Sequence, residues 1–326
     1  MFNIKLPKVK IFDRKVNLKF ENTLIIAPKD SGKTYLILNF LKEFEGSYFY
    51  TDFNNYFKEE FQKSDLTIFE NYDFSMELPN NPTFITSTKD IEVPNFKKIY
   101  LKSLDFEEYF SFNSNISPNV VFSHFLKDGN SPALPFKDEF FKMEYLREKI
   151  ELMPYNKVIL KFLLQNIGQK FSLYQIYETI KKRVKISKDT IYKEIKKIVD
   201  DKVIFLVNKW NSPKSPKKIF SYNFGYKNIL TKEKNILNIL ENMVFLELNE
   251  TEEIYYSEYI NFYLPKQKKI VLVMPFAEES QLETRLKHIS KKMVYEKIEI
   301  ITISNEFTMK DKNIEVKPFY LWALGE

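Results

Sequence analysis

Short, nearly continuous apolar runs recur along the first part of the chain. They are rich in β-branched and aromatic residues, which is typical of strands in a parallel sheet that is covered on both faces. Between the first two runs, Leu36, Phe40 and Leu41 recur at the spacing of one helix face, and Gly46 offers an end to that helix. This alternation predicts an α/β domain with a parallel sheet. The runs predicted as strands are Thr23–Ala27, Ser47–Thr51, Leu66–Glu70, Thr83–Ser87 and Lys98–Leu101.

The pattern becomes helical from Tyr155, after a turn-rich loop at residues 127–136. Three helices are predicted, in KVILKFLLQNI, SLYQIYETIKK and SKDTIYKEIKKIVDD, the last with Ser187 as its N-cap. Two strands follow, in KVIFLVNKW and KKIFSYNF. Three helices and a hairpin in this order predict a winged helix. Beyond it, a helix in ILNILENMVFLEL, then strands and a further helix, predict another α/β unit.

Composition narrows the class of protein. The 326 residues include no cysteine and two histidines, which excludes disulfides and thiolate zinc sites and disfavours a multi-histidine metal centre. No apolar run is long enough to span a bilayer, and the first ten residues lack the apolar core of a secretory signal. We therefore expect a cytoplasmic protein.

Positive charge is concentrated in the predicted winged helix. The segment from Tyr155 to Tyr226 has 16 Lys or Arg against 5 Asp or Glu, although the whole chain has a net charge of only +6. Because a recognition helix enters the major groove and a wing contacts phosphates, we predict binding to double-stranded DNA. No arginine lies on the third helix, so little base specificity is expected. The alternative is a winged helix that mediates protein contacts only. The lysines expected to contact DNA are Lys188, Lys193, Lys196, Lys197, Lys214 and Lys217, with Lys209 and Lys218 also on the hairpin.

The segment APKDSGKT has the spacing of a phosphate-binding loop between a strand and a helix, with alanine at its first position where glycine is usual. In such a loop, backbone N–H groups surround the phosphates. Lys33 would reach the β- and γ-phosphates, and the Thr34 hydroxyl would bind Mg²⁺. The sequence therefore predicts a site for ATP and Mg²⁺. Its residues are Ala27, Pro28, Lys29, Asp30, Ser31, Gly32, Lys33 and Thr34.

Hydrolysis of ATP also needs a carboxylate that organises Mg²⁺ and a base for water. Glu70 ends the third apolar run and is expected to be the base, but Phe69 stands where a metal-organising aspartate is usual. Asp52, after the second run, is expected near the metal instead. Ser87, at the end of the fourth run, is the expected sensor of the γ-phosphate.

The order of these segments resembles that of bacterial and archaeal AAA-type ATPases, which join a phosphate-loop domain, a winged helix and a C-terminal domain related to PD-(D/E)XK nucleases. The resemblance is carried by LIIAPKDSGKT, LTIFEN, FITSTK, IYLKSLDFEEYFSF, ISKDTIYKEIKKIVDDKVIFLV, FSYNFGYKNIL and ILENMVFLEL. It implies an AAA-type phosphate-loop ATPase domain at 1–118, a helical linker at 119–154, the winged helix at 155–226 and a small α/β domain like a restriction endonuclease at 227–326.

The same resemblance places Glu241 at a helix carboxylate of the nuclease site. That site usually adds an aspartate and a Glu-x-Lys strand, but Asn261 stands at the first position and the strand IVLVMPF has neither carboxylate nor lysine. An amide does not replace the charge of a lost metal ligand. We therefore predict that this domain has no nuclease activity.

Together these features predict an ATPase that couples its nucleotide state to a DNA-binding winged helix. The alternative is a nucleotide-binding regulator or interaction scaffold that does not turn ATP over, and Phe69 is the residue that favours it. A small-molecule kinase is less favoured. Such enzymes usually close an arginine-bearing lid over the phosphates, and the whole chain has only four arginines. The oligomeric state stays open, a homo-oligomer included.

Overall fold

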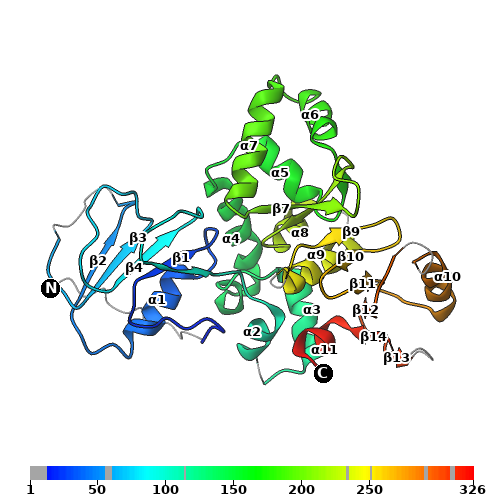
Figure 1. Cartoon of the computed structure of the whole chain (residues 1–326), viewed down its shortest axis with the longest axis horizontal. Coiled ribbons are helices and arrows are strands. Elements are labelled where there is room, and N and C mark those ends of the chain that lie inside the picture. The colour runs from blue at the N-terminus through cyan, green and yellow to red at the C-terminus, as the bar shows by residue number, and fades with distance from the viewer. Residues whose placement is uncertain are drawn as a thin grey trace. The chain divides into compact units, whose positions relative to one another are not determined.

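The computed structural model describes residues 13–55, 61–113, 115–232, 235–249, 252–289, 293–308 and 313–326 (Figure 1). The chain divides into two compact units. The first holds the described residues up to Leu104 together with Ser131–Ala133, and the second holds Asp105–Asn130 and Leu134–Glu326. Within the described ranges, no helix has the length and apolar character needed to cross a membrane.

The first unit is built on a five-stranded parallel sheet with the strand order β2-β3-β4-β1-β5. The carboxyl ends of parallel strands meet at one edge, so the loops that follow β1, β2, β3 and β4 share that edge. The parallel α/β sheet predicted from the apolar runs is thus confirmed. Its strands are β1 (Thr23–Ile26), β2 (Tyr48–Asp52), β3 (Leu66–Glu70), β4 (Thr83–Ser87) and β5 (Lys97–Tyr100).

The two faces of this sheet are covered differently. Helix α1 (Lys33–Leu41) covers one face (Figure 1). Its Leu36 and Leu41 pack against Ile25 and Ile68. In the described part of the unit, the other face is covered by side chains from loops rather than by a helix. These side chains form a cluster with the strands that contains Leu24, Ile26, Phe49, Phe53, Phe69, Tyr72, Ile85 and Val93.

Helix α1 ends at Leu41, several residues before the glycine that was expected to stop it. Gly46 has a different role, because a Cβ atom there would lie 2.6 Å from the ring of Phe44 and 3.2 Å from Asp65. The glycine lets this turn pass close to its neighbours before β2 begins.

The second unit starts with a group of helices, most of which, though not the first two, surround one apolar core. Ile159, Ile176 and Ile191, from three successive helices, are buried together in it. The Ser187 side chain accepts a hydrogen bond from the Thr190 N–H at 3.1 Å, which confirms the predicted N-cap. The helices are α2 (Phe106–Ser111), α3 (Pro118–Asp128), a short 3-10 turn (Leu134–Phe136), α4 (Glu139–Leu152), α5 (Lys157–Gln165), α6 (Leu173–Lys181), α7 (Lys188–Asp200) and α8 (Gly225–Leu230).

The hairpin after α7 belongs to a larger, nine-stranded sheet with the order β13-β14-β12-β11-β10-β9-β7-β8-β6. Strand β7 pairs antiparallel with β8 and also pairs in parallel with β9, through Asn208 with Tyr255 and Lys209 with Tyr256. The hairpin is therefore continuous with the sheet of the C-terminal part. The strands are β6 (Lys170–Phe171), β7 (Ile204–Lys209), β8 (Lys217–Ser221), β9 (Tyr255–Tyr256), β10 (Phe262–Leu264), β11 (Lys269–Val273), β12 (Lys297–Thr302), β13 (Phe307–Thr308) and β14 (Ile314–Pro318).

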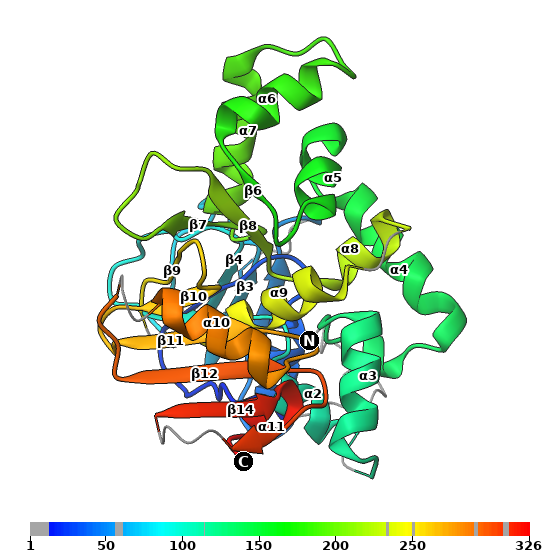
Figure 2. The same ribbon diagram turned by 90° about the vertical axis from the view of Figure 1, so that its right-hand side faces the viewer.

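Helices cover both faces of the C-terminal part of this sheet (Figure 2). Helix α10 (Glu279–Ile289) packs Leu282 into a core with Ile270 and Leu272 of β11. On the other face, Phe245 of α9 (Ile236–Leu248) stacks on Phe220 with the ring centroids 4.5 Å apart. The final helix, α11 (Phe319–Leu324), follows β14 directly.

Candidate functional site

The loop from Ala27 to Thr34 leaves the carboxyl end of β1 and enters the N-terminus of α1. Gly32 is the N-cap and has φ of 91°, a left-handed conformation that glycine adopts without steric cost. The first N–H groups of a helix have no partner within the helix, and the helix dipole is positive there. This geometry is suited to an anion such as a phosphate.

Ala27, at the unusual first position of the loop, is buried. Its methyl group belongs to the core that α1 forms with the sheet, and its backbone N–H donates to the Ser87 carbonyl oxygen at 3.0 Å. Alanine is therefore compatible with this loop conformation, because its side chain packs into the core.

Lys33 lies beneath the loop, and its ammonium donates to the carbonyl oxygens of Ala27 and Pro28, both at 2.9 Å. Burial lowers the pKa of Lys33 to about 8, although the nearby Glu70 and Asp30 act in the opposite direction. The lysine is thus poorly solvated and bound only to neutral acceptors. A phosphate oxygen would be a better acceptor for it, since hydrogen bonds between ionised groups are the stronger ones.

Glu70 lies across from the loop and meets the first turn of α1. Its Oε1 accepts a hydrogen bond from the Thr34 hydroxyl at 2.7 Å, and its Oε2 accepts one from the Tyr50 hydroxyl at 2.6 Å. Burial and the adjacent carboxylate raise the pKa of Tyr50, so the phenol stays protonated and remains a donor. The structure thus brings Thr34 and Glu70, two of the residues singled out in the sequence, into direct contact.

Phe69 points away from the loop, into the core on the face opposite α1. It is fully buried, stacks on Tyr72 at 5.3 Å and meets Phe53 edge to face, also at 5.3 Å. Successive residues of a strand point to opposite faces, so the side chain at position 69 lies on the wrong face to approach the loop while Glu70 faces it.

The other two residues expected around the nucleotide have local hydrogen-bond partners. Asp52 is in register with Glu70, and its Oδ1 accepts hydrogen bonds from the Asn71 side chain at 2.9 Å and from the Asn54 N–H at 3.0 Å. The Ser87 hydroxyl donates to the Lys89 carbonyl oxygen at 2.8 Å. Their roles as metal ligand and phosphate sensor stay predictions.

Arg14 is a residue that the sequence did not point to. Its guanidinium donates to the Ser31 carbonyl oxygen at 3.1 Å and to the Lys102 carbonyl oxygen at 2.8 Å, so it links the loop to the segment after β5. A Cβ atom on Gly32 would lie 3.2 Å from the same guanidinium. The only signal in the sequence is the rarity of arginine in this chain, since these contacts join residues far apart along it.

The residues present fit Mg²⁺ and a phosphate. The Ser31 hydroxyl in the loop is completely buried and has no hydrogen-bond partner. Among the described residues there is no cluster of three or more His, Cys, Asp or Glu side chains that could hold a metal alone. One hydroxyl and one carboxylate at Thr34 and Glu70 nevertheless suit Mg²⁺, which binds through one or two carboxylates with substrate phosphates and water completing its shell.

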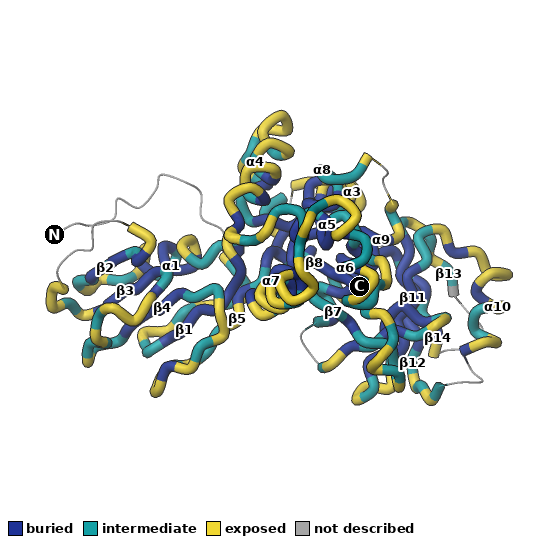
Figure 3. Tube along the Cα trace, turned by 90° about the horizontal axis from the view of Figure 1, so that it is seen from above, coloured by how far each residue is buried: buried dark blue, intermediate teal, exposed yellow. Residues whose placement is uncertain are grey.

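The lysines expected to contact DNA lie in the second unit and are mostly exposed. Helix α7 is exposed along its outer side (Figure 3), whereas Ile191, Ile195 and Ile198 are buried. Lys197 also donates to the Pro154 carbonyl oxygen at 2.9 Å. The exposed lysines are Lys188, Lys193, Lys196, Lys197 and Lys214, while Lys217 is half-buried.

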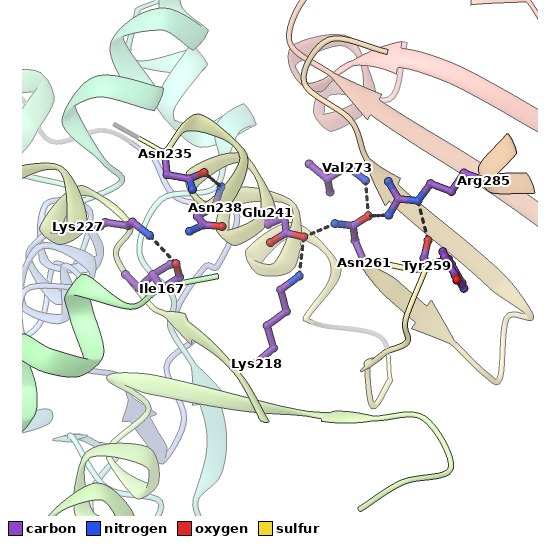
Figure 4. Close-up of polar contacts among 10 residues, drawn as sticks. All are labelled: Ile167, Lys218, Lys227, Asn235, Asn238, Glu241, Tyr259, Asn261, Val273 and Arg285. Atoms are coloured by element: carbon purple, nitrogen blue, oxygen red, sulfur yellow. Dashed lines mark hydrogen bonds and ion pairs between the residues drawn. The ribbon is translucent and has the colours of Figure 1, made fainter. Parts of the chain in front are cut away.

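Lys218 does not belong to this exposed set, so the expectation that it contacts DNA together with the other lysines of the hairpin was wrong. It is 5% exposed, and its ammonium donates to Oε1 of Glu241 on α9 at 2.5 Å (Figure 4). Phe220, two residues further along β8, stacks on Phe245 of α9, so this face of the hairpin lies against α9 and Lys218 points the same way.

Glu241 is the centre of a second buried polar cluster (Figure 4). The Asn261 side chain also donates to Oε1 of Glu241. In turn, Oδ1 of Asn261 accepts hydrogen bonds from Arg285 at 2.6 Å and from the Val273 N–H at 3.0 Å. The structure thus brings together Glu241 and Asn261, the two positions compared with a nuclease site, and adds an ammonium where a metal would otherwise balance the charge.

Comparisons with known proteins give little beyond this geometry. No protein-family model matches the chain, and no curated protein matches it. Among solved structures, the chain is similar to a Walker-type ATPase of Pyrococcus abyssi, with 13% sequence identity and a TM-score of 0.41 over 64% of this chain and 90% of that chain. The function is therefore inferred from the site itself.

Proposed function

We propose that this protein binds ATP together with Mg²⁺ at the loop from Ala27 to Thr34. The observation that carries the proposal is the contact between the Thr34 hydroxyl and Glu70 at 2.7 Å, directly at the N-terminus of α1. A phosphate-binding loop needs a helix N-terminus, a lysine beneath it, and a hydroxyl with a carboxylate for the metal. All of these lie together in the first unit.

Each residue has a distinct part in this proposal. The N–H groups at the start of α1 bind phosphate oxygens, and Lys33 exchanges its carbonyl acceptors for the β- and γ-phosphates. Thr34 and Glu70 would hold Mg²⁺, which neutralises charge on the phosphates when it is bound. Arg14 holds the loop in place through the Ser31 carbonyl.

The proposed activity is hydrolysis of ATP to ADP and phosphate, as in the AAA-type ATPases that the sequence resembles. The alternative is a regulator that binds ATP and turns it over very slowly. Phe69 first suggested this alternative, and its burial in the core supports the view that it has no part in the chemistry.

The test measures ATP binding and phosphate release on the same samples of wild-type protein, Lys33→Ala and Lys42→Ala. Lys42 is an exposed lysine directly after the last residue of α1, outside the loop, and serves as the matched control. We expect Lys33→Ala to weaken ATP binding by about 30-fold or more, the equivalent of losing about 2 kcal/mol from charge-assisted hydrogen bonds. Lys42→Ala should change it by less than about 3-fold. Binding without phosphate release that depends on Lys33 selects the regulator, and absence of ATP binding contradicts both forms of the proposal.

We further propose that α5, α6, α7 and the β7–β8 hairpin act as a winged helix on double-stranded DNA, under control of the nucleotide state. The concentration of exposed lysines on α7 and on the tip of the hairpin supports this. Lys188 also lies over the rings of Tyr174 and Tyr192, at 5.9 and 5.4 Å from their centroids, which leaves its charge at the surface.

DNA binding through phosphate contacts should weaken steeply with salt. If about four to six lysines release counterions, the affinity for a duplex should fall by roughly 10²- to 10³-fold between 50 and 200 mM salt. Lys193→Ala/Lys196→Ala should weaken binding and reduce the salt slope by about 2, whereas Lys266→Ala/Lys287→Ala is the control outside α7 and the hairpin. A salt-independent affinity, or equal effects of the two double variants, would reject DNA binding through these lysines. The remaining function for the winged helix would then be contact with other proteins.

We propose no nuclease function for the C-terminal part. The Glu241 carboxylate already has the ammonium of Lys218 and the amide of Asn261 as partners. Among the described residues, no group of three or more His, Cys, Asp or Glu side chains that could hold a metal is found there. Metal-dependent cleavage of duplex DNA that is lost in Glu241→Ala would contradict this.

A further inference from the structure

The last two residues of β3, Phe69 and Glu70, point to opposite faces of the sheet. Their directions change the roles that the sequence suggested for them, which were the metal-organising position and the base. Phe69 faces the core and Glu70 faces the loop, so the strand offers one carboxylate to the first turn of α1. That carboxylate touches the Thr34 hydroxyl, which is the group expected to bind Mg²⁺. Glu70 therefore occupies the place of the metal-organising carboxylate, and Phe69 does not mark a gap in the site.

Tyr50 makes this placement specific. Its hydroxyl donates to Oε2 of Glu70 at 2.6 Å, while the Thr34 hydroxyl donates to Oε1. Each oxygen of the carboxylate therefore has its own hydroxyl partner. A general base must be able to turn toward water and accept its proton. The carboxylate between Thr34 and Tyr50 is instead fixed at the hydroxyl of the loop, and Tyr50 is its positioning residue.

The next residue along the chain, Asn71, lies at the same edge of the sheet. It has φ of 51°, its N–H donates to the Thr86 hydroxyl at 2.9 Å, and its side-chain amide donates to Asp52. In the hydrolysis of ATP, an O–P bond forms between water and the γ-phosphorus while the bond to the β,γ-bridging oxygen breaks, and the water proton must pass to a base. A carboxamide cannot take that proton, because the Asn side chain has no basic atom at neutral pH.

We propose that Glu70 organises the metal and that Asn71 takes the position from which a base would act, so that the site binds ATP in a metal-dependent way and hydrolyses it slowly. This inference rests on the proposed ATP site and deepens it, because it favours the regulator over the rapid ATPase. It also moves the metal role from Asp52 to Glu70. Asp52 then serves to hold Asn71.

The metal dependence of ATP binding tests the role of Glu70. Equilibrium binding of ATP is measured with Mg²⁺ and with EDTA for the wild type, Glu70→Gln, Asp52→Asn and Lys33→Ala. Mg²⁺ should strengthen binding to the wild type and to Asp52→Asn by about 10-fold or more. In Glu70→Gln this gain should fall below about 3-fold while binding in EDTA is kept, because Lys33 and the helix N-terminus are intact. If Glu70 were the base, Glu70→Gln would keep the full gain, and that result overturns the inference while the ATP site stands.

A second variant, in which Asp52 and Asn71 exchange their side-chain types, tests the role of Asn71. This test does not depend on whether Glu70→Gln folds. Asp52→Asn/Asn71→Asp keeps one amide and one carboxylate in contact, and both Asn and Asp tolerate the left-handed conformation at position 71. Phosphate release by this variant should rise by about 10-fold or more over the wild type, since a positioned base contributes about 10²- to 10⁴-fold. An unchanged or lower rate overturns the assignment of Asn71. Failure of the wild type to bind ATP, with Lys33→Ala no different, would instead reject the proposed function and this inference with it.

Discussion

Glu70 of the first unit and Glu241 of the second are equally buried, at 5% and 3% exposure, but their partners differ in charge. Glu70 accepts hydrogen bonds from two neutral hydroxyls, Thr34 and Tyr50, while the nearby Lys33 bonds to carbonyl oxygens instead. Glu241 accepts from an ammonium and an amide. A carboxylate held by hydroxyls keeps its charge available for an incoming cation, whereas one paired with a lysine is already neutralised. The comparison explains why one site is proposed to hold a metal and the other is not.

The largest expected effect comes from breaking the pair of Lys218 and Glu241. Lys218→Met removes the ammonium that is hydrogen-bonded to the buried Glu241 carboxylate and leaves it only the more distant charges of Lys170, Lys227 and Arg285. It should lower the free energy of unfolding of the second unit by up to about 3–5 kcal/mol. Lys218→Met/Glu241→Gln removes both charges, keeps an acceptor for Asn261, and should recover most of that loss. Chemical denaturation of the three proteins measures the difference. Equal losses in the single and double variants would show that the ion pair does not hold this cluster together.

The smallest expected effect is the uptake of a fraction of a proton when ATP binds. Burial lowers the pKa of Lys33 to about 8, so part of the lysine population is neutral at pH 8.5 in the absence of nucleotide. A phosphate beside the ammonium favours the charged form and raises this pKa, so ATP binding at pH 8.5 should take up a fraction of a proton. Calorimetry in buffers of different ionisation enthalpy measures it, and Lys33→Arg, which stays charged throughout, is the control. Equal proton uptake by the two proteins would place the titrating group elsewhere.

Local patterns in the sequence predicted much of the architecture. The strands of the first sheet are apolar runs because both faces are buried, and the cap at Ser187 depends only on the three residues that follow it. The phosphate loop could also be predicted from the sequence, because the loop and the helix α1 that follows it lie within one short segment.

What the sequence left open depends on single-residue register and on pairing between distant segments. Whether position 69 or 70 faces the loop is decided by one step along β3, and a shift of one residue exchanges the two faces of a strand. The inward turn of Lys218 depends on the packing of α9 against β8, and the contacts of Arg14 reach Lys102, far along the chain. These contacts have no local signature in the sequence.

The most direct measurement compares ATP binding, with Mg²⁺ and with EDTA, in Glu70→Gln and Glu241→Gln side by side. Both variants replace a buried carboxylate by an amide, so they differ only in which glutamate is changed. We expect Glu241→Gln to keep the metal-dependent gain of the wild type, about 10-fold or more, and Glu70→Gln to lose it. A full metal-dependent gain in Glu70→Gln, or no ATP binding by the wild type, would contradict the claim that Thr34 and Glu70 hold the metal of a nucleotide site.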